Sequence, residues 1–208
     1  MPDYFPAFLD VRGRRCLVVG GGPIGERKVR DLLACGAAVV VVSPALTDAL
    51  AALAAVGAVQ HRARRFLKAD ARGCALVIAA TGRPSIDDAV ADAARRHRAL
   101  VNVVDRPATC DFIVPSVLQR GELQIAVSTG GRSPALAREI RKQLETTFGP
   151  EYAGLIERVG RRRRPRVSTP ASGSLRARSL RSRPSGREAV LRPCCIVKPS
   201  LVGSDSWP

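Results

Sequence analysis

The chain has 208 residues, of which 46% are hydrophobic and 25% charged, and this composition is typical of a globular protein of one or two domains. Its charge is uneven, because residues 1–157 carry 21 basic and 16 acidic side chains whereas residues 158–208 carry 13 and 2. No apolar run approaches the roughly 18 residues of a membrane span, and the amino terminus lacks the pattern of a signal peptide. These features predict a cytoplasmic protein with no membrane partner.

The cysteines form no metal-binding or disulfide pattern. The chain has six cysteines and two histidines, and no two cysteines are spaced as Cys-x-x-Cys. We therefore expect no metal site, and we interpret most of the cysteines as small buried apolar residues.

Strand and helix patterns alternate through the first 105 residues. Short apolar runs predict strands at 16–19, 39–42, from 59, at 76–80 and at 100–104, and helical spacing predicts helices at 24–34, 45–56 and 85–96. Because the strands are almost continuously apolar, we expect an α/β fold with a parallel sheet covered by helices on both faces.

The pattern changes after Asp105. Residues 112–115 and 123–127 are predicted as two strands of a hairpin-like unit, and a helix is predicted over 134–147. From Arg161 the chain is rich in Arg, Ser and Pro, and such a tail is expected to be disordered. Basic disorder can bind nucleic acid, but the tail lacks interleaved aromatic residues, so we do not expect nucleic acid as the main partner.

A glycine-rich loop follows the first predicted strand. Gly20, Gly22 and Gly25 satisfy G-x-G-x-x-G, and Pro23 and Ile24 open the next helix. In a Rossmann-like fold these glycines allow the tight turn, the approach of a pyrophosphate and close helix packing, and the helix N-terminus attracts phosphate. The sequence therefore predicts dinucleotide binding, although a glycine turn that merely joins strand to helix gives the same pattern.

The second strand ends without the acidic residue that usually binds a ribose. Ser43 and Pro44 stand there instead, so this position does not decide between NAD and NADP. Two interpretations fit the basic residues Arg62, Arg64 and Arg65. They could bind the 2′-phosphate of NADP, but we favour a run of charged side chains in solvent.

A polar cluster ends the fifth strand, with Asn102, Asp105 and Arg106. Ligands of such sheets bind outside the carboxyl ends of the strands, so Asp105 is expected near the nicotinamide, where a carboxylate can accept a proton as hydride leaves carbon. A turn-capping role for Asp105 is the alternative. Thr81, at the end of the fourth strand, is expected to line the same cleft.

A second polar run, from Ser128 to Pro134, opens the last predicted helix. Ser133 is a candidate N-cap with Pro134 at the first helical position, and glycines, hydroxyls and a helix N-terminus suit a carboxylate. A simple capped turn remains the alternative. The residues of this run that are candidates for substrate binding are Ser128, Thr129, Gly130, Arg132 and Ser133. Arg138, Arg141 and Lys142 on the helix face either an acidic substrate or water.

Taken together, these segments resemble the precorrin-2 dehydrogenase/sirohydrochlorin ferrochelatase family of sirohaem biosynthesis. The resemblance covers residues 1 to about 157 and is specific, because the GGG-x-x-x-E-R-K and STGG-x-SP-x-LAR runs are not general features of dinucleotide-binding folds. The matching segments are 4–11, 16–28, 78–81, 102–105, 112–116 and 126–138.

The resemblance implies an enzyme that uses NAD⁺ to oxidise precorrin-2, a reduced tetrapyrrole with eight carboxylates, to sirohydrochlorin. Some members also insert Fe²⁺. It implies that Asp105 is the general base, that Gly22, Pro23 and Ile24 with Ser43, Pro44 and Ala45 hold NAD, and that the protein is a homodimer. An octa-acid substrate also suits Arg106, Arg132 and Arg138 as its ligands. An NAD-responsive regulatory module without catalysis is the alternative, but it leaves the 128–134 run unexplained.

We accordingly expect three regions: an NAD-binding domain at 1–113, a dimerisation region at 114–159 and a basic tail at 160–208. Members of the family continue with a small helical domain where this chain has Arg161 to Arg164. A frame shift in the coding sequence is our hypothesis for that departure.

Overall fold

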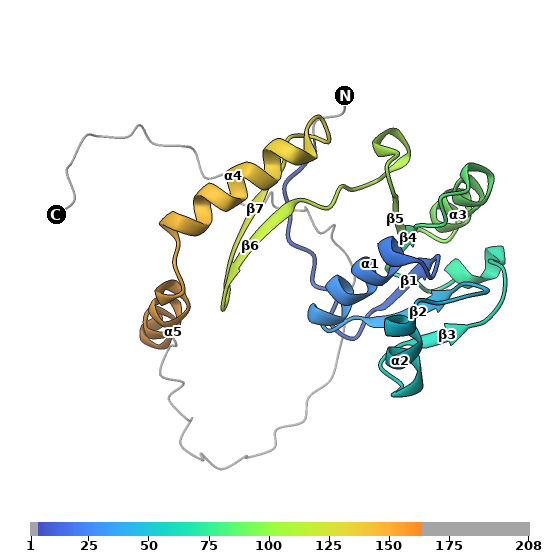
Figure 1. Cartoon of the computed structure of the whole chain (residues 1–208), viewed down its shortest axis with the longest axis horizontal. Coiled ribbons are helices and arrows are strands. Elements are labelled where there is room, and N and C mark those ends of the chain that lie inside the picture. Colours follow the sequence, from blue (N-terminus) through green and yellow to red (C-terminus); the bar gives the residue numbers. More distant parts are fainter. Residues whose placement is uncertain (1–3, 164–208) are drawn as a thin grey trace, which may run out of the picture. The chain divides into compact units, whose positions relative to one another are not determined.

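The protein is described by a computed structural model over residues 4–163 (Figure 1). A parallel sheet has the strand order β3-β2-β1-β4-β5, so the expected parallel α/β sheet is confirmed. Its strands are β1 (Arg15–Val19), β2 (Ala38–Val42), β3 (Gln60–Arg62), β4 (Leu76–Ala79) and β5 (Leu100–Val103).

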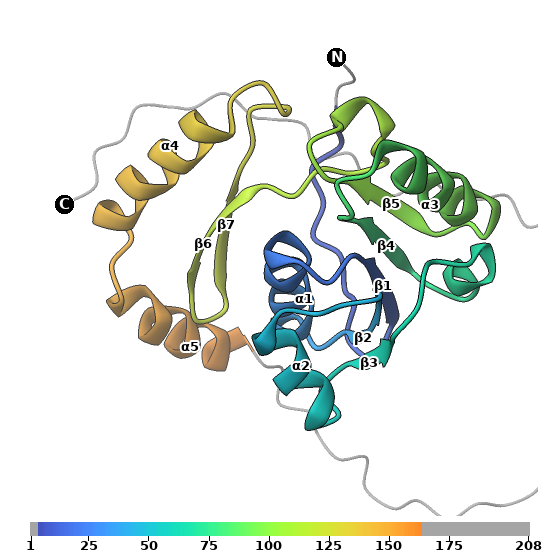
Figure 2. The ribbon, with the colours of Figure 1, turned by 45° about the vertical axis from the view of Figure 1, so that its right-hand side comes forward.

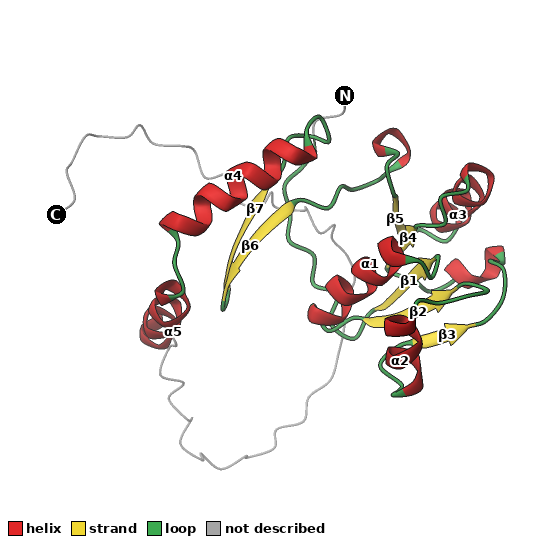
Figure 3. Cartoon of the chain, in the orientation of Figure 1, coloured by secondary structure: helices red, strands yellow, loops and turns green. Residues whose placement is uncertain are grey.

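Helices cover both faces of this sheet, as the apolar strands predicted (Figure 3). Helices α1 (Pro23–Ala34) and α2 (Asp48–Ala55) pack on one face, whereas α3 (Pro84–Arg96) packs on the other. Two 3₁₀ turns, η1 (Lys68–Ala71) and η2 (Pro107–Thr109), join the remaining segments.

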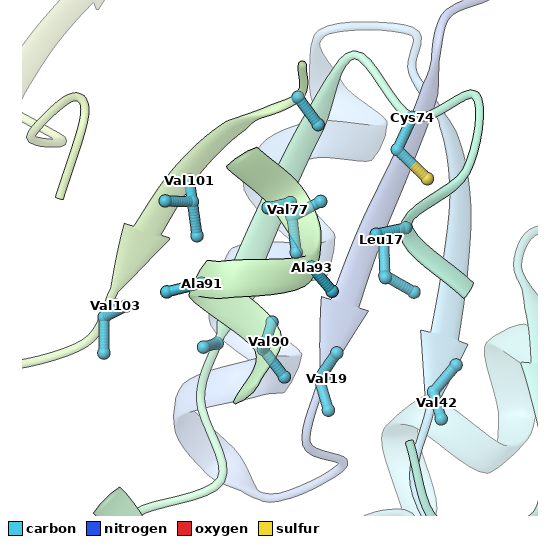
Figure 4. Packing of buried hydrophobic residues seen from close by; sticks show 14 of the residues in the cluster. Leu17, Val19, Val42, Cys74, Val77, Val90, Ala91, Ala93, Val101 and Val103 are labelled. Atoms are coloured by element: carbon cyan, nitrogen blue, oxygen red, sulfur yellow. The ribbon is translucent and has the colours of Figure 1, made fainter. Parts of the chain in front are cut away.

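The central strand β1 is buried on both sides. Leu17 and Val19 join the cluster beneath α3 (Figure 4), and Cys16 and Val18 join the cluster beneath α1 and α2. Successive strand residues point to opposite faces, so the four buried residues between the two helical layers, Cys16 to Val19, are all apolar. This packing holds the carboxyl ends of the strands in a fixed arrangement.

A hairpin and two helices follow the sheet (Figure 2). Strands β6 (Ser116–Arg120) and β7 (Leu123–Val127) pair antiparallel, α4 (Pro134–Thr147) packs along them, and α5 (Glu151–Arg163) lies against β7. The predicted helix at 134–147 is confirmed. The carboxyl-terminal helix α5 passes residue 160, where we expected the tail to begin.

The strand predicted at 112–115 is wrong, because the first hairpin strand begins at Ser116. Pro115 has no N–H to donate to a strand ladder. The preceding residues are held by β5 instead: the Asp111 amide donates to the Val101 carbonyl at 2.8 Å, and Asn102 Nδ2 donates to the Phe112 carbonyl at 3.0 Å. The apolar run therefore forms a connection whose Phe112 packs on the core.

Residues 164–208 lie outside the described residues. The expectations that concern them are disorder, the frame shift, nucleic-acid binding and the state of Cys194 and Cys195. Within residues 4–163, none of the helices combines the length and the apolar character needed to cross a membrane.

The basic run after β3 surrounds a buried carboxylate. Asp70 is 2% exposed, and its Oδ1 accepts from Arg62 Nη1 and Arg64 Nη2 at 2.6 Å each. The Leu67 amide donates to Oδ2 at 2.9 Å. Interpreting Arg62 and Arg64 as a solvated run of charge is therefore wrong for these two residues.

Burial alone would raise the pKa of the Asp70 carboxyl. The hydrogen bonds from Arg64, the Leu67 amide and Arg62 outweigh burial and lower the pKa from 3.8 to about 2. Since the pKa in the folded state is the lower one, the carboxylate stabilises the fold above about pH 4, and this contribution is lost as the pH falls through about 2.

We predict that Asp70→Asn lowers the free energy of unfolding at pH 7 by about 2 kcal/mol, because a pKa difference of roughly two units is worth that much. The difference between variant and wild type should shrink as the pH falls from about 4 to 2. Urea unfolding at several pH values measures both effects.

The matched control is Asp10→Asn, because Asp10 pairs with Arg12 at 2.7 Å but lies in solvent. Solvent screening makes such exposed pairs weak, so this variant should change stability far less. Equal losses in the two variants would show that burial of Asp70 is not the cause.

Candidate functional site

The glycine loop between β1 and α1 is held by backbone contacts that leave no room for side chains. A Cβ on Gly20, whose φ is +118°, would lie 2.3 Å from the Ala80 carbonyl oxygen, and one on Gly25 would lie 2.2 Å from that of Gly20. Gly22 differs, because a Cβ there would meet no protein atom within 4 Å. Packing thus explains Gly20 and Gly25, while Gly22 faces open space.

Helix α1 begins at this open position. Gly22 is its N-cap, Pro23 is its first residue, and no side chain caps it. The first amides of a helix have no partner within the helix, so the amides of Ile24 and Gly25 and the positive end of the helix dipole suit a phosphate. The loop therefore fits a dinucleotide, as the sequence predicted.

The segment that joins β2 to α2 lies directly against the glycine loop. The Thr47 amide donates to the Gly21 carbonyl at 2.9 Å, and Thr47 Oγ1 donates to Glu26 Oε2 at 2.7 Å. Hydrogen bonds from Thr47 and Arg30 lower the pKa of Glu26. Sequence reasoning assigned no role to Glu26 or Thr47, although Glu26 belongs to the GGG-x-x-x-E-R-K run.

The expected cofactor residues at the end of β2 lie beside this contact. Ser43 is 9% exposed and its hydroxyl donates to the Ala45 carbonyl at 2.7 Å. A Cβ on Gly21 would lie 2.2 Å from the same carbonyl oxygen. Ser43, Pro44 and Ala45 are therefore placed next to the loop.

Thr81, at the end of β4, is held by a buried carboxylate. Its amide and hydroxyl both donate to Asp87 Oδ1, at 3.3 and 2.7 Å, and Asp87 is 5% exposed on α3. This pair anchors the turn that follows β4. We expected Thr81 to line the same cleft as Asp105, but it does not line the cavity that contains Asp105. Asp87, to which sequence analysis assigned no role, does line it.

A cavity of about 220 Å³ joins the ends of these elements. Asp105 lines it together with Ile24 of α1 and Asp87 of α3, so the structure places the candidate base beside the glycine loop. The remaining lining residues are Ala80, Gly82, Pro84, Val104 and Arg106.

Asp105 has an uncommon backbone conformation. Its φ is +59°, in the left-handed region that Asp and Asn tolerate better than other side chains. Residues held in this region are frequent at functional sites.

Arg106, the next residue, forms an ion pair with Asp88, in which Arg106 Nη1 lies 2.6 Å from Asp88 Oδ1.

Neighbouring groups fix the turn that carries Asp105. The buried Asn102 amide donates to the Phe112 carbonyl, and Cys110 Sγ accepts from the Val103 amide at 3.1 Å. Asn102 is thus engaged in holding the chain, and it does not line the cavity that contains Asp105.

The run from Ser128 to Ser133 forms a capped turn that touches the Asp105 turn. Ser133 Oγ accepts from the Leu136 amide at 3.2 Å, as expected of an N-cap. Thr129 Oγ1 accepts from the Ser133 amide at 3.0 Å. A Cβ on Gly131 would lie 3.5 Å from Pro107, so the two polar clusters are neighbours.

A second cavity, of about 440 Å³, lies on the α1 side of this turn. The expected substrate residues Ser128, Thr129 and Arg138 line it, whereas Gly130, Arg132 and Ser133 line neither of the two cavities. Sequence reasoning missed two cationic residues of α1 on the same cavity, Arg27 and Lys28.

Within residues 4–163, no three His, Cys, Asp or Glu side chains are grouped so that they could hold a metal ion. The chemical groups that the site offers are a dinucleotide cradle, a carboxylate beside it and a neighbouring cationic cavity.

Comparison with known proteins agrees with this arrangement. A family model described as NAD(P)-binding matches residues 7–116, and a model described as sirohaem biosynthesis protein central matches residues 120–147. The solved structure of "SirC, precorrin-2 dehydrogenase" is similar with a TM-score of 0.67 and 26% identity, and the match covers 76% of this chain and 78% of that one.

Longer relatives share the same region. The siroheme synthase of Methylococcus capsulatus is 44% identical over 165 residues, and that of Thioalkalivibrio sulfidiphilus is 46% identical over 157. These matches cover 79% and 76% of this chain but 35% and 32% of the relatives, so the chain spans about a third of their length. The chain belongs to the NAD(P)-binding family that matches residues 7–116, and the resemblance to the precorrin-2 dehydrogenases of sirohaem biosynthesis is confirmed.

Proposed function

We propose that this protein oxidises precorrin-2 to sirohydrochlorin with NAD⁺ as the hydride acceptor. The observation that carries the proposal is the cavity in which Asp105 and Ile24 lie together, because it places a carboxylate next to the amides that suit a pyrophosphate. The siroheme synthases and the precorrin-2 dehydrogenase to which the chain is similar support the choice of substrate.

The reaction removes one hydride and one proton from the tetrapyrrole. NAD⁺, when bound, supplies the acceptor for the hydride and its electron pair. Asp105 accepts the proton from the adjacent position of the substrate and later releases it to water, so that the carboxylate returns to its ionised form. The Cys110 and Asn102 contacts fix the turn that carries Asp105, whose backbone is left-handed.

NAD is the cofactor that we propose in preference to NADP. A 2′-phosphate needs a basic partner near the end of β2. Arg62, which pairs with Val42 across the sheet, and Arg64 are both bound to Asp70. Because Asp70 occupies both guanidinium groups, the arrangement supports a cofactor whose ribose carries no 2′-phosphate, which is NAD.

Insertion of Fe²⁺ into sirohydrochlorin is a second candidate activity. The tetrapyrrole nitrogens would bind the Fe²⁺ substrate, and Asp105 would accept the protons that they release. An assay with sirohydrochlorin and Fe²⁺ but without NAD⁺ measures this activity separately.

A homodimer is also part of the proposal. A two-stranded sheet is marginally stable by itself, and the hairpin and its helices expose Val117, Leu136, Leu155 and Val159 at 41%, 52%, 42% and 53%. A second copy of the chain would cover these apolar side chains.

The cytoplasmic location expected from the sequence stays a prediction.

We predict that the protein forms sirohydrochlorin when it is incubated anaerobically with precorrin-2 and NAD⁺, and that Asp105→Asn lowers kcat by at least about 10²-fold. Asparagine tolerates the left-handed backbone, so the fold and NAD⁺ binding should persist. Absorbance follows the product, and calorimetry follows NAD⁺.

Asp92→Asn is the control, because Asp92 is an exposed carboxylate on α3 that lines neither cavity. Unchanged turnover in Asp105→Asn would remove Asp105 as the base. A folded wild-type protein that binds NAD⁺ but forms no product would favour the regulatory module.

We predict that Gly22→Ala raises the KM for NAD⁺ at least about 10-fold, since the methyl group would enter the space that a pyrophosphate needs. The φ of Gly22 is −82°, which alanine adopts readily, so the melting temperature should fall by only a few degrees, about 4 °C at most. Gly25→Ala is the contrasting variant, because its Cβ would clash with the backbone and lower stability. An unchanged KM in Gly22→Ala would argue against cofactor contact at this residue.

We predict that light scattering gives twice the 22.2 kDa mass of the chain, and that Val117→Asp shifts the protein toward the monomer because it buries a charge at the contact. Val56→Asp is the control, because Val56 is 78% exposed after α2, outside the hairpin. A wild-type monomer at micromolar concentration would contradict the proposal.

A further inference from the structure

The larger cavity has the chemistry of a site for an anionic ligand with an apolar body. Arg27 and Lys28 from α1 and Arg138 from α4 line it, against one carboxylate, that of Asp31. Ile113, Val114 and Pro115 supply apolar wall. Its volume of about 440 Å³ lies in the usual range of small-molecule sites.

Lys28 is the unusual member of this group. It is half-buried, and burial is the main cause that lowers its pKa; Arg27 lowers it further, while Asp31 and Asp105 raise it. In the part of the chain that the structure describes, no hydrogen bond contributes to that pKa and no acidic group lies within ion-pair distance of the ammonium.

An ammonium in this position is costly for the fold. Taking a charge even partly out of water without a partner destabilises a protein. The buried carboxylate of Asp70 avoids this cost because it is paired with Arg62 and Arg64. The charge of Lys28 is therefore explained if its partner is a ligand rather than a residue of the chain.

The position of Lys28 along α1 links the two cavities. The helix starts after its N-cap Gly22 with the amides that suit a pyrophosphate. Lys28 follows Gly25 by three residues, which is about 4.5 Å along the axis. Asp105 lines the smaller cavity of about 220 Å³, which lies beside the glycine loop and is called the cofactor-side cavity below. Asp105 is also one of the charges that act on Lys28.

We propose that Lys28 binds a peripheral carboxylate of the tetrapyrrole from the larger cavity, and that it thereby determines specificity for a polycarboxylate substrate. This inference rests on the proposed function for the identity of the ligand. Arg27 and Arg138 add positive charge at the same cavity, and the apolar wall faces the macrocycle. The ring carbons that react then lie toward Asp105.

The test is an anaerobic absorbance titration of the full 208-residue chain with sirohydrochlorin, in the absence of NAD⁺. Lys28→Met should weaken binding about 10- to 100-fold, because it removes a charge-assisted hydrogen bond. Lys28→Arg should restore most of the affinity. The binding of NAD⁺ should stay within about twofold in both variants.

Lys68→Met is the matched control, because Lys68 is exposed on η1 and lines neither cavity. The melting temperature separates a binding role from a structural one, because removing a half-buried charge that has no partner in the chain should leave the melting temperature unchanged or raise it. If Lys28→Met destabilises the fold, Lys28→Gln replaces it in the titration.

Two results would overturn the inference: sirohydrochlorin affinity within about twofold of wild type in the neutral variants, or no binding of sirohydrochlorin by the wild type. If the wild type binds sirohydrochlorin in a Lys28-dependent way but does not oxidise precorrin-2, the proposed function fails while the assignment of Lys28 stands.

Discussion

The site depends on close contacts between backbone segments at the glycine loop. Gly20 approaches the Ala80 carbonyl, Gly21 approaches that of Ala45, and Gly25 approaches that of Gly20. These contacts hold the carboxyl ends of β1, β2 and β4 to the start of α1, because no side chain separates them. The cofactor-side cavity exists where these ends meet, and Asp105 enters it from the neighbouring strand β5.

The hairpin and its helix add what the sheet alone lacks. The turn around Gly131 packs on Pro107, next to Asp105, and α4 then brings Arg138 to the cavity that Lys28 lines. Reaction chemistry and recognition of charge are therefore assigned to adjacent places. The sheet supplies the first, and the cavity that α1 lines together with the hairpin region supplies the second.

Much of this arrangement is readable from sequence because it is local or periodic. Apolar runs such as Val39 to Val42 have one explanation, a strand buried on both faces, and the loop after Val19 is recognisable by glycines at fixed spacing. Asp105 is identifiable because a strand directs the residue that follows it to a known edge of the sheet.

The misses share a cause, which is that they depend on partners distant in space. The apolar run at 112–115 has the composition of a strand but is tied to β5 through Asn102. Arg62 and Arg64 look solvated until the 3₁₀ turn η1 brings Asp70 beneath them. Lys28 lines a cavity together with residues of the hairpin and α4, and no spacing along α1 reveals these distant partners.

The use of one helix for both cavities limits how the loop can change over evolution. An α-helix turns by about 100° per residue, so inserting or deleting a single residue between Gly25 and Lys28 would swing the lysine away from its cavity while the amides at the start of α1 stayed in place. We therefore expect this stretch to tolerate substitution better than a change of length, and variants with altered substrate preference to arise by exchange of side chains at constant length.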